Sequence, residues 1–475
     1  MPRHITADNI RRYALCPCGL YLDHHGPQEE RAEAHAFLEH LRDLGIEHEQ
    51  AVIATLPHLA VPAGSLQFRA QVTLHLLREG HARIYQPVLT AGDLVGIPDF
   101  LERVEIPSDL GPFAYRPVDI KISASAKDEH DDQLAFYSLL LGRLQGLSPD
   151  TGDVILLDHG RETVELSGQM GRVERIVADV REVMAGRSES PSLSTECGMC
   201  PWQEHCLTTL YRTNDVSLLD GFGPARKAVL IDAGYPNLRA VACADADRLC
   251  ELRGIGQRTA ERIVLQARVL LERRPRVISR PQLADAKIEL YLDMECQQGT
   301  QMIYLIGVLQ CEQGQGDEFI AFVADRPDDE GEMWGRLLEY VRGLPSDPVI
   351  YHYHNFEATH LRKLAKRHGI DPGSEARLFG GLLDLHRVLK DSVVLPVHSY
   401  GLKAVAKWMG FRWRETGADA AMSMLWFDLW LSTGDRGYLE ASIRYNEDDC
   451  RATGVVKAWL GAISDDAERH TSAGR

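Results

Sequence analysis

Apolar residues in the first part of the chain follow the short period of β-strands and then the longer period of a helix. Alternating runs predict strands over residues 83–89 and 94–104, with a turn at Gly92 between them. A third strand is predicted over residues 114–122 and a helix over residues 128–144. This region is therefore expected to be an α/β domain that begins with a hairpin.

Strand and helix signals also alternate in the last part of the chain. The predicted strands cover residues 288–294, 302–309, 318–323 and 348–354, and the predicted helices cover residues 332–342 and 357–368. This alternation indicates an α/β fold with a mixed sheet. Between the two α/β regions, residues 219–230 and 252–264 repeat one pattern of a leucine, a Gly-x-Gly turn and a small-residue helix. The repeat predicts a small all-α module.

The length of 475 residues exceeds what one hydrophobic core usually supports. We therefore expect three domains, over residues 1–210, 211–280 and 281–475. No apolar run approaches the roughly 18 to 20 residues that span a bilayer, and the N-terminus lacks a signal-peptide core. The protein is accordingly expected to be cytoplasmic and to have no membrane partner.

The net charge of -17 argues weakly against nucleic acid as a partner, because phosphate binding needs clustered cations. Residues 221–280, however, hold twelve Lys and Arg against six Asp and Glu. Carboxylates also suit a metal site, so an acidic total is compatible with a metal enzyme that carries a basic binding strip.

Two carboxylates and a lysine are expected to converge in the first domain. Asp119 and Lys121 stand two residues apart on the third predicted strand and so share a face, and Asp99 lies in the second strand. Carboxylates can fix a divalent cation, and an ammonium group can orient or deprotonate the attacking water in phosphodiester hydrolysis. Taken alone, an Asp-x-Lys pair is more often a solvated strand face.

The order of residues in this domain resembles the RecB-type branch of the PD-(D/E)xK nucleases. The resemblance rests on six positions in the family's order: His48, Asp99, Asp119, Lys121, Gln133 and Tyr137. It implies that His48, Asp99 and Asp119 hold Mg²⁺ or Mn²⁺ and that Lys121 serves the attacking water. The last two positions would contact DNA or brace the site.

Three cysteines near the end of the first domain are spaced like metal ligands. Cys197, Cys200 and Cys206 lie within ten residues, and Cys16 or Cys18 supplies a fourth thiolate. Four thiolates suit a zinc ion and an iron–sulfur cluster equally well. Iron–sulfur members of the RecB-type group place one cysteine before the nuclease core and a C-x-x-C-x5-C run after it. The resemblance therefore implies a 4Fe–4S staple, and Cys16 matches the family position better than Cys18.

The repeated glycine turns of the middle module, 221–223 and 254–256, each precede a predicted helix. Glycine lets the backbone approach a ligand, and helix N-terminal amides suit phosphate. The pattern resembles paired helix-hairpin-helix motifs, which grip DNA backbones without reading sequence. Gly254 and Gly256 form the closer copy, and Arg258 and Arg262 are expected to add phosphate contacts. The alternative is a structural linker whose glycines only cap helices.

Acidic residues from three distant segments of the third domain are candidates for a second metal centre. Asp293 and Glu295 end a predicted strand on one face, and Glu357 follows a later strand. Tyr445 and Asp449 are four residues apart and hence neighbours on a helix. Four carboxylates are what two cations roughly 3.5 to 4 Å apart need to activate water and stabilise a leaving oxygen.

This acidic set resembles the DEDDy exonuclease branch of the RNase H-like superfamily. The resemblance implies that Tyr445 orients the attacking water and that 5′-mononucleotides are released in the 3′-to-5′ direction. Glu357 departs from the family, which usually has Asp there, and this puts metal spacing and activity in doubt.

Four further side chains of the third domain are candidates near this centre. Asp384 is a candidate fifth carboxylate or a partner of the others. His352 and His354 are expected to pack beside the site rather than bind metal. Lys403 either touches substrate phosphate or is solvated.

Together these features predict a metal-dependent nuclease that acts on single-stranded or end-containing DNA in repair, recombination or phage defence. RNA stays open as a substrate. No Gly-x-x-x-x-Gly-Lys-Ser/Thr motif occurs, so we infer a separate helicase as a partner. Two alternatives stay open. One is a single active centre with the other domain as a scaffold, the third domain being the weaker candidate for activity, and the other is a non-catalytic nucleic-acid-binding adaptor.

Overall fold

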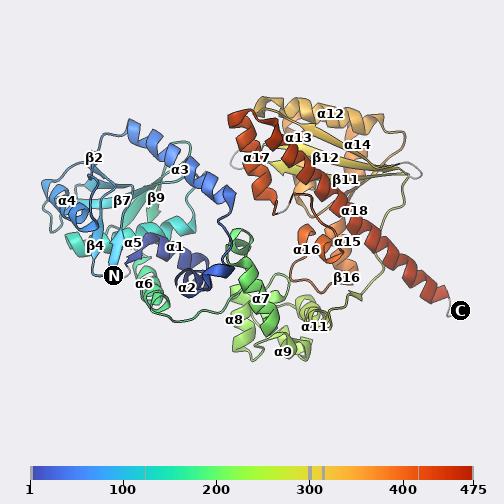
Figure 1. The fold of residues 1–475 in the computed structure, drawn as a ribbon, viewed down its shortest axis with the longest axis horizontal. Helices are drawn as coiled ribbons and strands as arrows, with labels where there is room; N and C mark the ends of the chain where they lie inside the picture. The colour runs from blue at the N-terminus through green and yellow to red at the C-terminus, as the bar shows by residue number, and fades with distance from the viewer. Residues whose placement is uncertain (1–3, 124, 298–301, 313–315, 416, 473–475) are drawn as a thin grey trace. The chain divides into compact units, whose positions relative to one another are not determined.

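The computed structural model describes residues 4–123, 125–297, 302–312, 316–415 and 417–472, with side chains as far as residue 463. The chain divides between Thr209 and Leu210 into two compact units. Each unit contains its own β-sheet, with helices packed against it (Figure 1).

The first unit is built on a six-stranded mixed sheet in the order β2-β3-β6-β7-β8-β9. Its strands are β2 (Leu59–Ala60), β3 (Arg83–Tyr85), β6 (Phe100–Val104), β7 (Ala114–Ile120), β8 (Thr151–Ile155) and β9 (Arg161–Glu165). Strands β7 and β8 are parallel, whereas β6 and β7 are antiparallel. Helix α5 (Asp128–Gln145) packs on β7 and forms much of the core, because most of its residues from Leu134 to Leu141 are apolar and buried.

The first two predicted strands are each interrupted. Residues 94–104 form β5 (Leu94–Gly96) and β6, and Pro98, which has no N–H to donate to a ladder, lies in the break. Strand β5 pairs with β4 (Leu89–Ala91) and β1 (Ile5–Thr6) in a separate three-stranded sheet. The predicted hairpin is thus present between β4 and β5, and the interruption places Asp99 immediately before β6.

Further helices surround these sheets. They are α1 (Ala7–Leu15), α2 (Pro17–His25), α3 (Ala36–Thr55), α4 (Leu66–Glu79), α6 (Met170–Met184) and α7 (Gln203–Thr213). Helix α1 has a capping box at Thr6, which fixes where it starts.

The second unit begins with short helices and continues into a five-stranded mixed sheet. The short-helix module contains α8 (Pro224–Asp232), α9 (Leu238–Ala242), α10 (Ala246–Leu249) and α11 (Gln257–Glu272). Strand β10 (Arg276–Val277) follows and pairs with β16 (Val393–Val394) of the sheet domain. This pairing joins the module to the domain that follows it.

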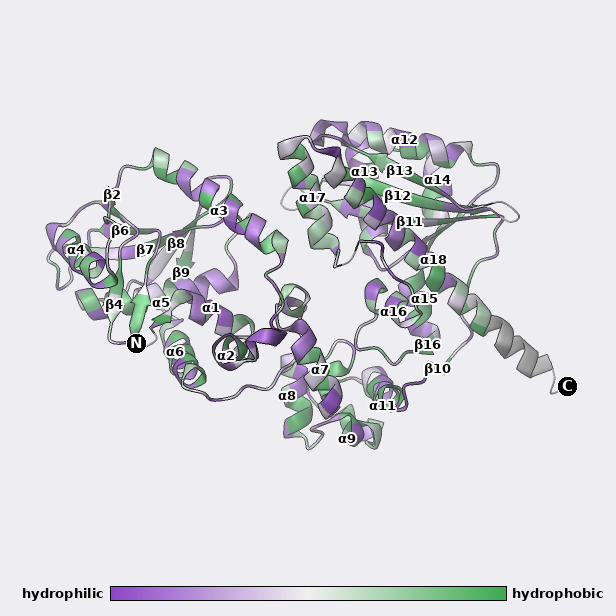
Figure 2. Cartoon of the chain, in the orientation of Figure 1, coloured by the Kyte–Doolittle hydropathy of each residue, from purple (hydrophilic) through white to green (hydrophobic). Residues whose placement is uncertain are grey.

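The sheet of the second unit has the order β13-β12-β11-β14-β15. Its strands are β11 (Ile288–Cys296), β12 (Ile303–Glu312), β13 (Glu318–Val323), β14 (Val349–His352) and β15 (Leu382–Asp384). The first three are antiparallel, and β11, β14 and β15 are parallel, so the predicted mixed sheet is confirmed. Figure 2 shows hydrophobic residues along β11 and β12, which lie in the middle of the fold.

The remaining helices cover this sheet. They are α12 (Glu330–Gly343), α13 (Phe356–His368), α14 (Pro372–Gly380), α15 (Leu385–Ser392), α16 (Leu402–Trp408), α17 (Ala420–Thr433) and α18 (Arg436–Ser472). Helix α18 packs on both β11 and β12. No helix in the described part of the chain is long and apolar enough to cross a bilayer.

Candidate functional site

Three carboxylates of the second unit meet where α18 crosses the sheet. Asp293 and Glu295 lie two residues apart on β11 and so point to the same side. Asp449 lies on α18, and one carboxylate oxygen from each of the three residues lies within 4.8 Å of the others. Residues more than 150 positions apart in sequence are thereby brought together.

Two side chains that the sequence analysis did not single out hold these carboxylates in place. Asn446 Nδ2 donates to Asp293 Oδ2 at 2.7 Å, and Trp413 Nε1 donates to Asp449 Oδ1 at 2.7 Å. Gly307 on β12 lies opposite Asp293, and a Cβ there would come within 1.7 Å of Asn446 Oδ1. The close approach of α18 to the sheet therefore requires glycine at this position.

Burial and mutual repulsion disfavour the charged forms of these carboxyl groups. Burial, reinforced by Asp449 and Glu295, raises the pKa of Asp293. Burial and Asp449 likewise raise the pKa of Glu295. Burial raises the pKa of Asp449 to about 6, although the Trp413 hydrogen bond opposes the shift. A divalent cation would offset this repulsion with hard oxygen ligands, so the donor set fits a metal ion.

Tyr445 and Lys403 border a cavity of about 630 Å³ that Asp293 and Asp449 also line. Burial, together with Asp449, raises the pKa of Tyr445, so its phenol stays protonated and can donate a hydrogen bond. Lys403 Nζ lies 4.7 Å from the centre of the Tyr445 ring and also contacts the Ala418 carbonyl oxygen. Lys403 is therefore held over the tyrosine rather than extended into solvent.

Glu357 lies close to the three carboxylates but outside their group. It is buried in the first turn of α13, and its Oε2 lies 3.6 Å from His352 Nδ1 without a hydrogen-bond partner among the described residues. Its charge contributes to the raised pKa of Asp293, which places it in the same electrostatic environment. A buried carboxylate oxygen without a hydrogen-bond partner is suited to bind a cation whose coordination the other three carboxylates do not complete.

Asp384 and the neighbouring histidines have structural contacts. Asp384 Oδ1 accepts backbone hydrogen bonds from His386 at 2.9 Å and from His354 at 3.0 Å, and so caps α15. His352 Nδ1 lies 2.7 Å from the His354 carbonyl oxygen. These residues pack beside the carboxylates and shape the loop between β14 and α13.

In the first unit Asp99 and Asp119 are locked together by backbone contacts. Asp99 Oδ2 accepts from the Ile120 amide at 2.6 Å, and Asp119 Oδ1 accepts from the Asp99 amide at 3.3 Å. Lys121 Nζ lies 3.1 Å from Asp119 Oδ2. Burial and the charge of Asp119 raise the pKa of Asp99 to about 8, so the pair resists carrying two negative charges without a cation.

Lys121 and His48 complete the surroundings of this pair. Burial opposes the charge of Lys121, but Asp119 and Asp99 outweigh it and raise its pKa. His48 is buried on α3, its ring centre lies 5.3 Å from that of His159, and its Nε2 has no hydrogen-bond partner among the described residues. His48 does not join the two aspartates in a three-ligand group within the described residues.

Gln133 and Tyr137 face each other on α5. Gln133 Nε2 donates to the Tyr137 hydroxyl at 3.0 Å, and that hydroxyl donates to the Ile97 carbonyl at 3.3 Å. Tyr137 is buried, and a Cβ on Gly96 would lie 2.8 Å from its ring. Tyr137 therefore fixes the turn that carries Asp99, and Gln133 is the more exposed of the two.

Four cysteines of the first unit pack around Trp202, and a fifth, Cys197, lies near one of them. Cys16, Cys18, Cys200 and Cys206 pack with this buried indole, and Cys197 adds to the electrostatic surroundings of Cys16. The Cys18 thiol donates to Cys206 and lowers the pKa of Cys206 to about 7. No three of these sulfurs lie within 4.8 Å of one another in the described chain. The thiols thus lie near one another but do not form one compact set of metal ligands. Cys18 belongs to this cluster as well as Cys16.

A charged network borders the thiols. Arg12 Nη2 donates to Cys200 Sγ at 3.6 Å, and its Nε donates to Asp23 Oδ2 at 2.8 Å. Asp23 Oδ1 accepts from Trp202 Nε1 at 2.8 Å. A Cβ on Gly19 would lie 2.4 Å from the guanidinium, so glycine makes room for it. The guanidinium places positive charge beside a group of potential thiolates.

The second glycine turn of the helical module, at residues 254–256, leads directly into α11. Gly254 has a φ of +78°, which favours glycine, and Gly256 caps the exposed start of α11. Arg258 is exposed in the first turn of that helix. Arg262 is instead bound to the carbonyl oxygens of Lys390 at 2.6 Å and Val393 at 3.2 Å, so its guanidinium joins the module to the sheet domain.

Family comparisons agree with this division. A model of the PD-(D/E)XK nuclease superfamily matches residues 5–207, one of the SAM-like helix-hairpin-helix tandem matches residues 214–268, and one of the RNase H superfamily matches residues 290–461. No curated protein matches the chain. The chain carries these three domains in that order, which confirms the predicted fold class. Two nuclease superfamily domains imply a hydrolase with nuclease activity, and nucleases of these superfamilies use divalent metals.

Proposed function

We propose that the protein is a metal-dependent deoxyribonuclease that degrades single-stranded or end-containing DNA in repair, recombination or phage defence. The observation that carries this proposal is the group formed by Asp293, Glu295 and Asp449, buried beside Tyr445 at the wall of a cavity. A cation at these residues would stabilise the developing negative charge and increase the acidity of water.

The protein side chains of this centre have separable roles in the proposal. Asn446 and Trp413 orient Asp293 and Asp449, so the oxygens are held in place before a ligand arrives. Tyr445 donates a hydrogen bond that orients the attacking water, because its phenol keeps its proton. Lys403, held over the tyrosine ring, offers positive charge to the phosphate that enters the cavity. The expected products are 5′-mononucleotides released from the 3′ end.

The first unit would supply a second hydrolytic centre. Asp99 and Asp119, with His48, would hold its cation, and the buried His48 Nε2, which has no hydrogen-bond partner among the described residues, supports this assignment. Lys121 would orient the attacking water from its position beside Asp119. Tyr137 would brace the turn that carries Asp99, and Gln133 would contact nucleic acid.

A 4Fe–4S cluster is proposed for the cysteines of the first unit. Cys197, Cys200 and Cys206 would bind it with one cysteine from the start of α2. The packing of the other cysteines around Trp202, with Cys197 near Cys16, supports the proposal. When bound, the cluster would tie residues near Cys16 to residues near Cys206 and so act as a structural staple. Gly254, Gly256 and Arg258 would grip the phosphate backbone at the helical module.

The experiment that tests the nuclease proposal compares Asp119→Asn, Asp293→Asn and the double variant with the wild type. End-labelled single-stranded and duplex DNA and RNA are incubated with Mg²⁺, Mn²⁺ or EDTA. We expect each single variant to keep one activity and the double variant to lose both. Hydrolysis by the double variant, or none by the wild type on any substrate, would overturn the proposal.

A single active centre is the second candidate function, and the geometry favours the second unit for it. The three-oxygen group is found only there among the described residues, whereas Asp99, Asp119 and His48 form no such group. In that case Asp293→Asn alone abolishes all cleavage and Asp119→Asn leaves it unchanged.

A further inference from the structure

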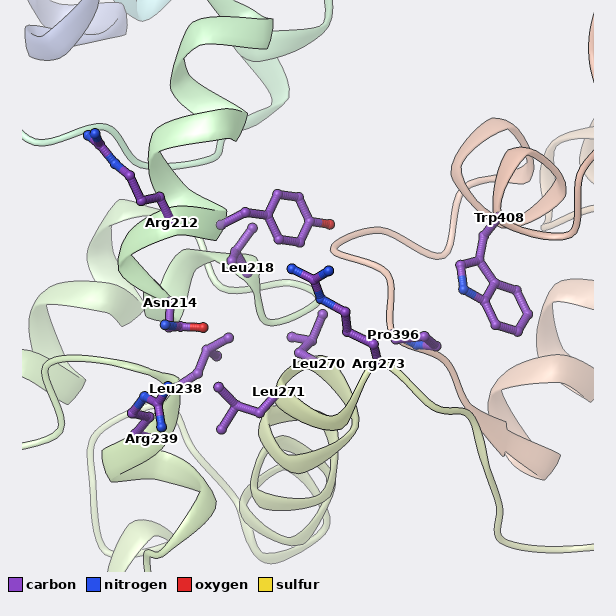
Figure 3. A pocket seen from close by; sticks show the side chains of 11 residues that line it. Arg212, Asn214, Leu218, Leu238, Arg239, Leu270, Leu271, Arg273, Pro396 and Trp408 are labelled. Carbon is purple, nitrogen blue, oxygen red and sulfur yellow. The ribbon is translucent and has the colours of Figure 1, made fainter.

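A second cavity of the second unit lies between the helical module and the sheet domain and has a volume of about 620 Å³ (Figure 3). Its walls come from the ends of α7 and α11, the start of α9 and the segments near Pro396 and Trp408. Leucines form its apolar part. Nothing in the proposed function makes use of this cavity.

Three arginines line the cavity, and no carboxylate does. They are Arg212, Arg239 and Arg273, and all three are exposed. Within the described residues none of these guanidinium groups donates a hydrogen bond or forms an ion pair. In a chain with a net charge of -17, three guanidinium groups that line one cavity without an acidic partner in the part of the chain that the structure describes indicate an anionic ligand.

Two aromatic side chains indicate which anion fits. Tyr211 is 42% exposed, and Trp408, which is partly buried, also lines the cavity. Aromatic faces beside guanidinium groups are what single-stranded nucleic acid uses, because bases stack on the rings while the backbone follows the cations. A duplex keeps its bases stacked inside the helix, so they cannot stack on these rings.

The cavity is separate from the glycine turn and adjoins the proposed exonuclease centre. Helix α11 has 16 residues, so Arg273 at its end lies about 24 Å along the helix from Gly256 at its start. On the other side, the Tyr211 hydroxyl lies 3.0 Å from Nδ1 of His398, which lines the cavity of Asp293 and Asp449. Pro396, two residues before His398, lines the arginine cavity.

We propose that the arginine cavity binds the backbone of single-stranded nucleic acid a few nucleotides from the end that occupies the cavity of Asp293 and Asp449. This placement rests on the proposed function, whereas the binding of a strand does not. A short substrate would occupy only the carboxylate cavity, and a longer strand would continue past Tyr211 to the three arginines. Affinity should therefore rise with strand length.

The test measures binding by the full chain with Asp119→Asn and Asp293→Asn in place, so that nothing is cut. Fluorescence anisotropy follows labelled oligothymidylates of 3 and 20 nucleotides at several salt concentrations. Adding Arg239→Gln and Arg273→Gln should weaken binding of the long strand about tenfold and reduce the salt slope by about 1.4, two contacts at about 0.7 each. The short strand should bind unchanged. Arg326→Gln, which removes an exposed arginine outside the cavity lining, is the matched control and should change neither.

Tyr211→Leu separates stacking from charge. It should weaken binding of the long strand while leaving the salt slope unchanged. The proposal is overturned if the double arginine variant binds the long strand with wild-type affinity and slope. It is equally overturned if thymidine 5′-monophosphate displaces the long strand at a concentration near the affinity of that strand, because the cavity would then be a nucleotide pocket.

A hydrolysis measurement distinguishes failure of this proposal from failure of the proposed function. The p-nitrophenyl ester of thymidine 5′-monophosphate is too short to reach the arginines. With Asp119→Asn alone in the background, the double arginine variant should hydrolyse it with Mn²⁺ at an unchanged rate. If the Asp119→Asn protein with its arginines intact also fails to hydrolyse the ester, the proposed exonuclease function is wrong. The strand-binding measurement still decides whether the arginine cavity binds nucleic acid.

Discussion

Replacing Gly307 by alanine is expected to disable the proposed nuclease centre of the second unit without altering any of its carboxylates. Gly307 lies on β12 opposite Asp293. An alanine Cβ would come within 1.7 Å of Asn446 Oδ1 and 3.0 Å of the Phe319 ring. Asn446 would have to move, and its 2.7 Å hydrogen bond to Asp293 would break.

The size of the effect follows from two costs. Overpacking a filled core costs about 1–3 kcal/mol, and losing a hydrogen bond to a charged group costs about 1.5–3 kcal/mol. We therefore expect Gly307→Ala to lower the free energy of unfolding by about 3–5 kcal/mol. Displacing Asp293 by about 1 Å should lower the rate of nucleotide release about 100-fold.

The assay uses an Asp119→Asn background, so that only the proposed centre of the second unit contributes. Release of labelled mononucleotides from single-stranded DNA is measured with Mn²⁺, and stability is measured by urea unfolding. Gly335→Ala on α12 is the control, because a Cβ there meets open space, and it should be neutral or stabilising by up to about 1 kcal/mol. Asn446→Ala, which removes the hydrogen bond without overpacking, should reproduce the loss of activity if Gly307→Ala is too unstable to assay. Wild-type activity and stability in Gly307→Ala would refute the reasoning.

Three further predictions concern the charge of Asp449, the proposed iron–sulfur cluster and the binding of DNA by the helical module. In EDTA, Asp449→Asn should raise the free energy of unfolding by roughly 3 kcal/mol at pH 8. The pKa of Asp449 in the folded chain is raised to about 6, so ionisation opposes folding above the unfolded pKa. The gain should shrink towards zero as the pH falls to about 4, and a gain independent of pH would contradict the shift. Anaerobically purified Cys206→Ser should lose iron and sulfide. A comparison of Cys16→Ser with Cys18→Ser should show that only one of these two cysteines is required for iron binding. Stoichiometric zinc in the wild type would refute the cluster. Arg258→Glu should weaken DNA binding and reduce its salt dependence in a filter assay, and unchanged affinity would favour a structural linker.

The sequence predicts the fold class and the identity of the acidic residues better than their supports. Asp293 and Glu295 follow the two-residue period of a strand, and Asp449 stands one helical turn from Tyr445, so local periodicity groups each pair. Only the resemblance to the exonuclease family joins the two pairs. Asn446 lies inside the same segment and could have been singled out as an amide beside buried carboxylates. Trp413 and Gly307 could not, because their roles depend on which strand and loop α18 crosses.

Local patterns also failed where one residue altered the chain path. Pro98 interrupts a run that otherwise continues as one strand, and this interruption moves β5 into another sheet. The position of Arg262 could not be predicted either, since its partners are carbonyl oxygens more than 120 residues away. Likewise, the spacing of the cysteines selects Cys16, whereas packing brings Cys18 against Cys206.

Because α18 crosses β11, the proposed catalytic machinery of the second unit exists only when the two ends of that domain pack together. Asp293 and Asp449 are separated by most of the RNase H-like domain, and neither strand nor helix alone presents more than a fraction of the ligand oxygens. A partly folded second unit therefore lacks the cation-binding geometry of this centre. Proteolysis or a frameshift anywhere between the two elements would leave this centre without its full set of ligand oxygens, whereas the proposed centre of the first unit lies before both elements in the chain.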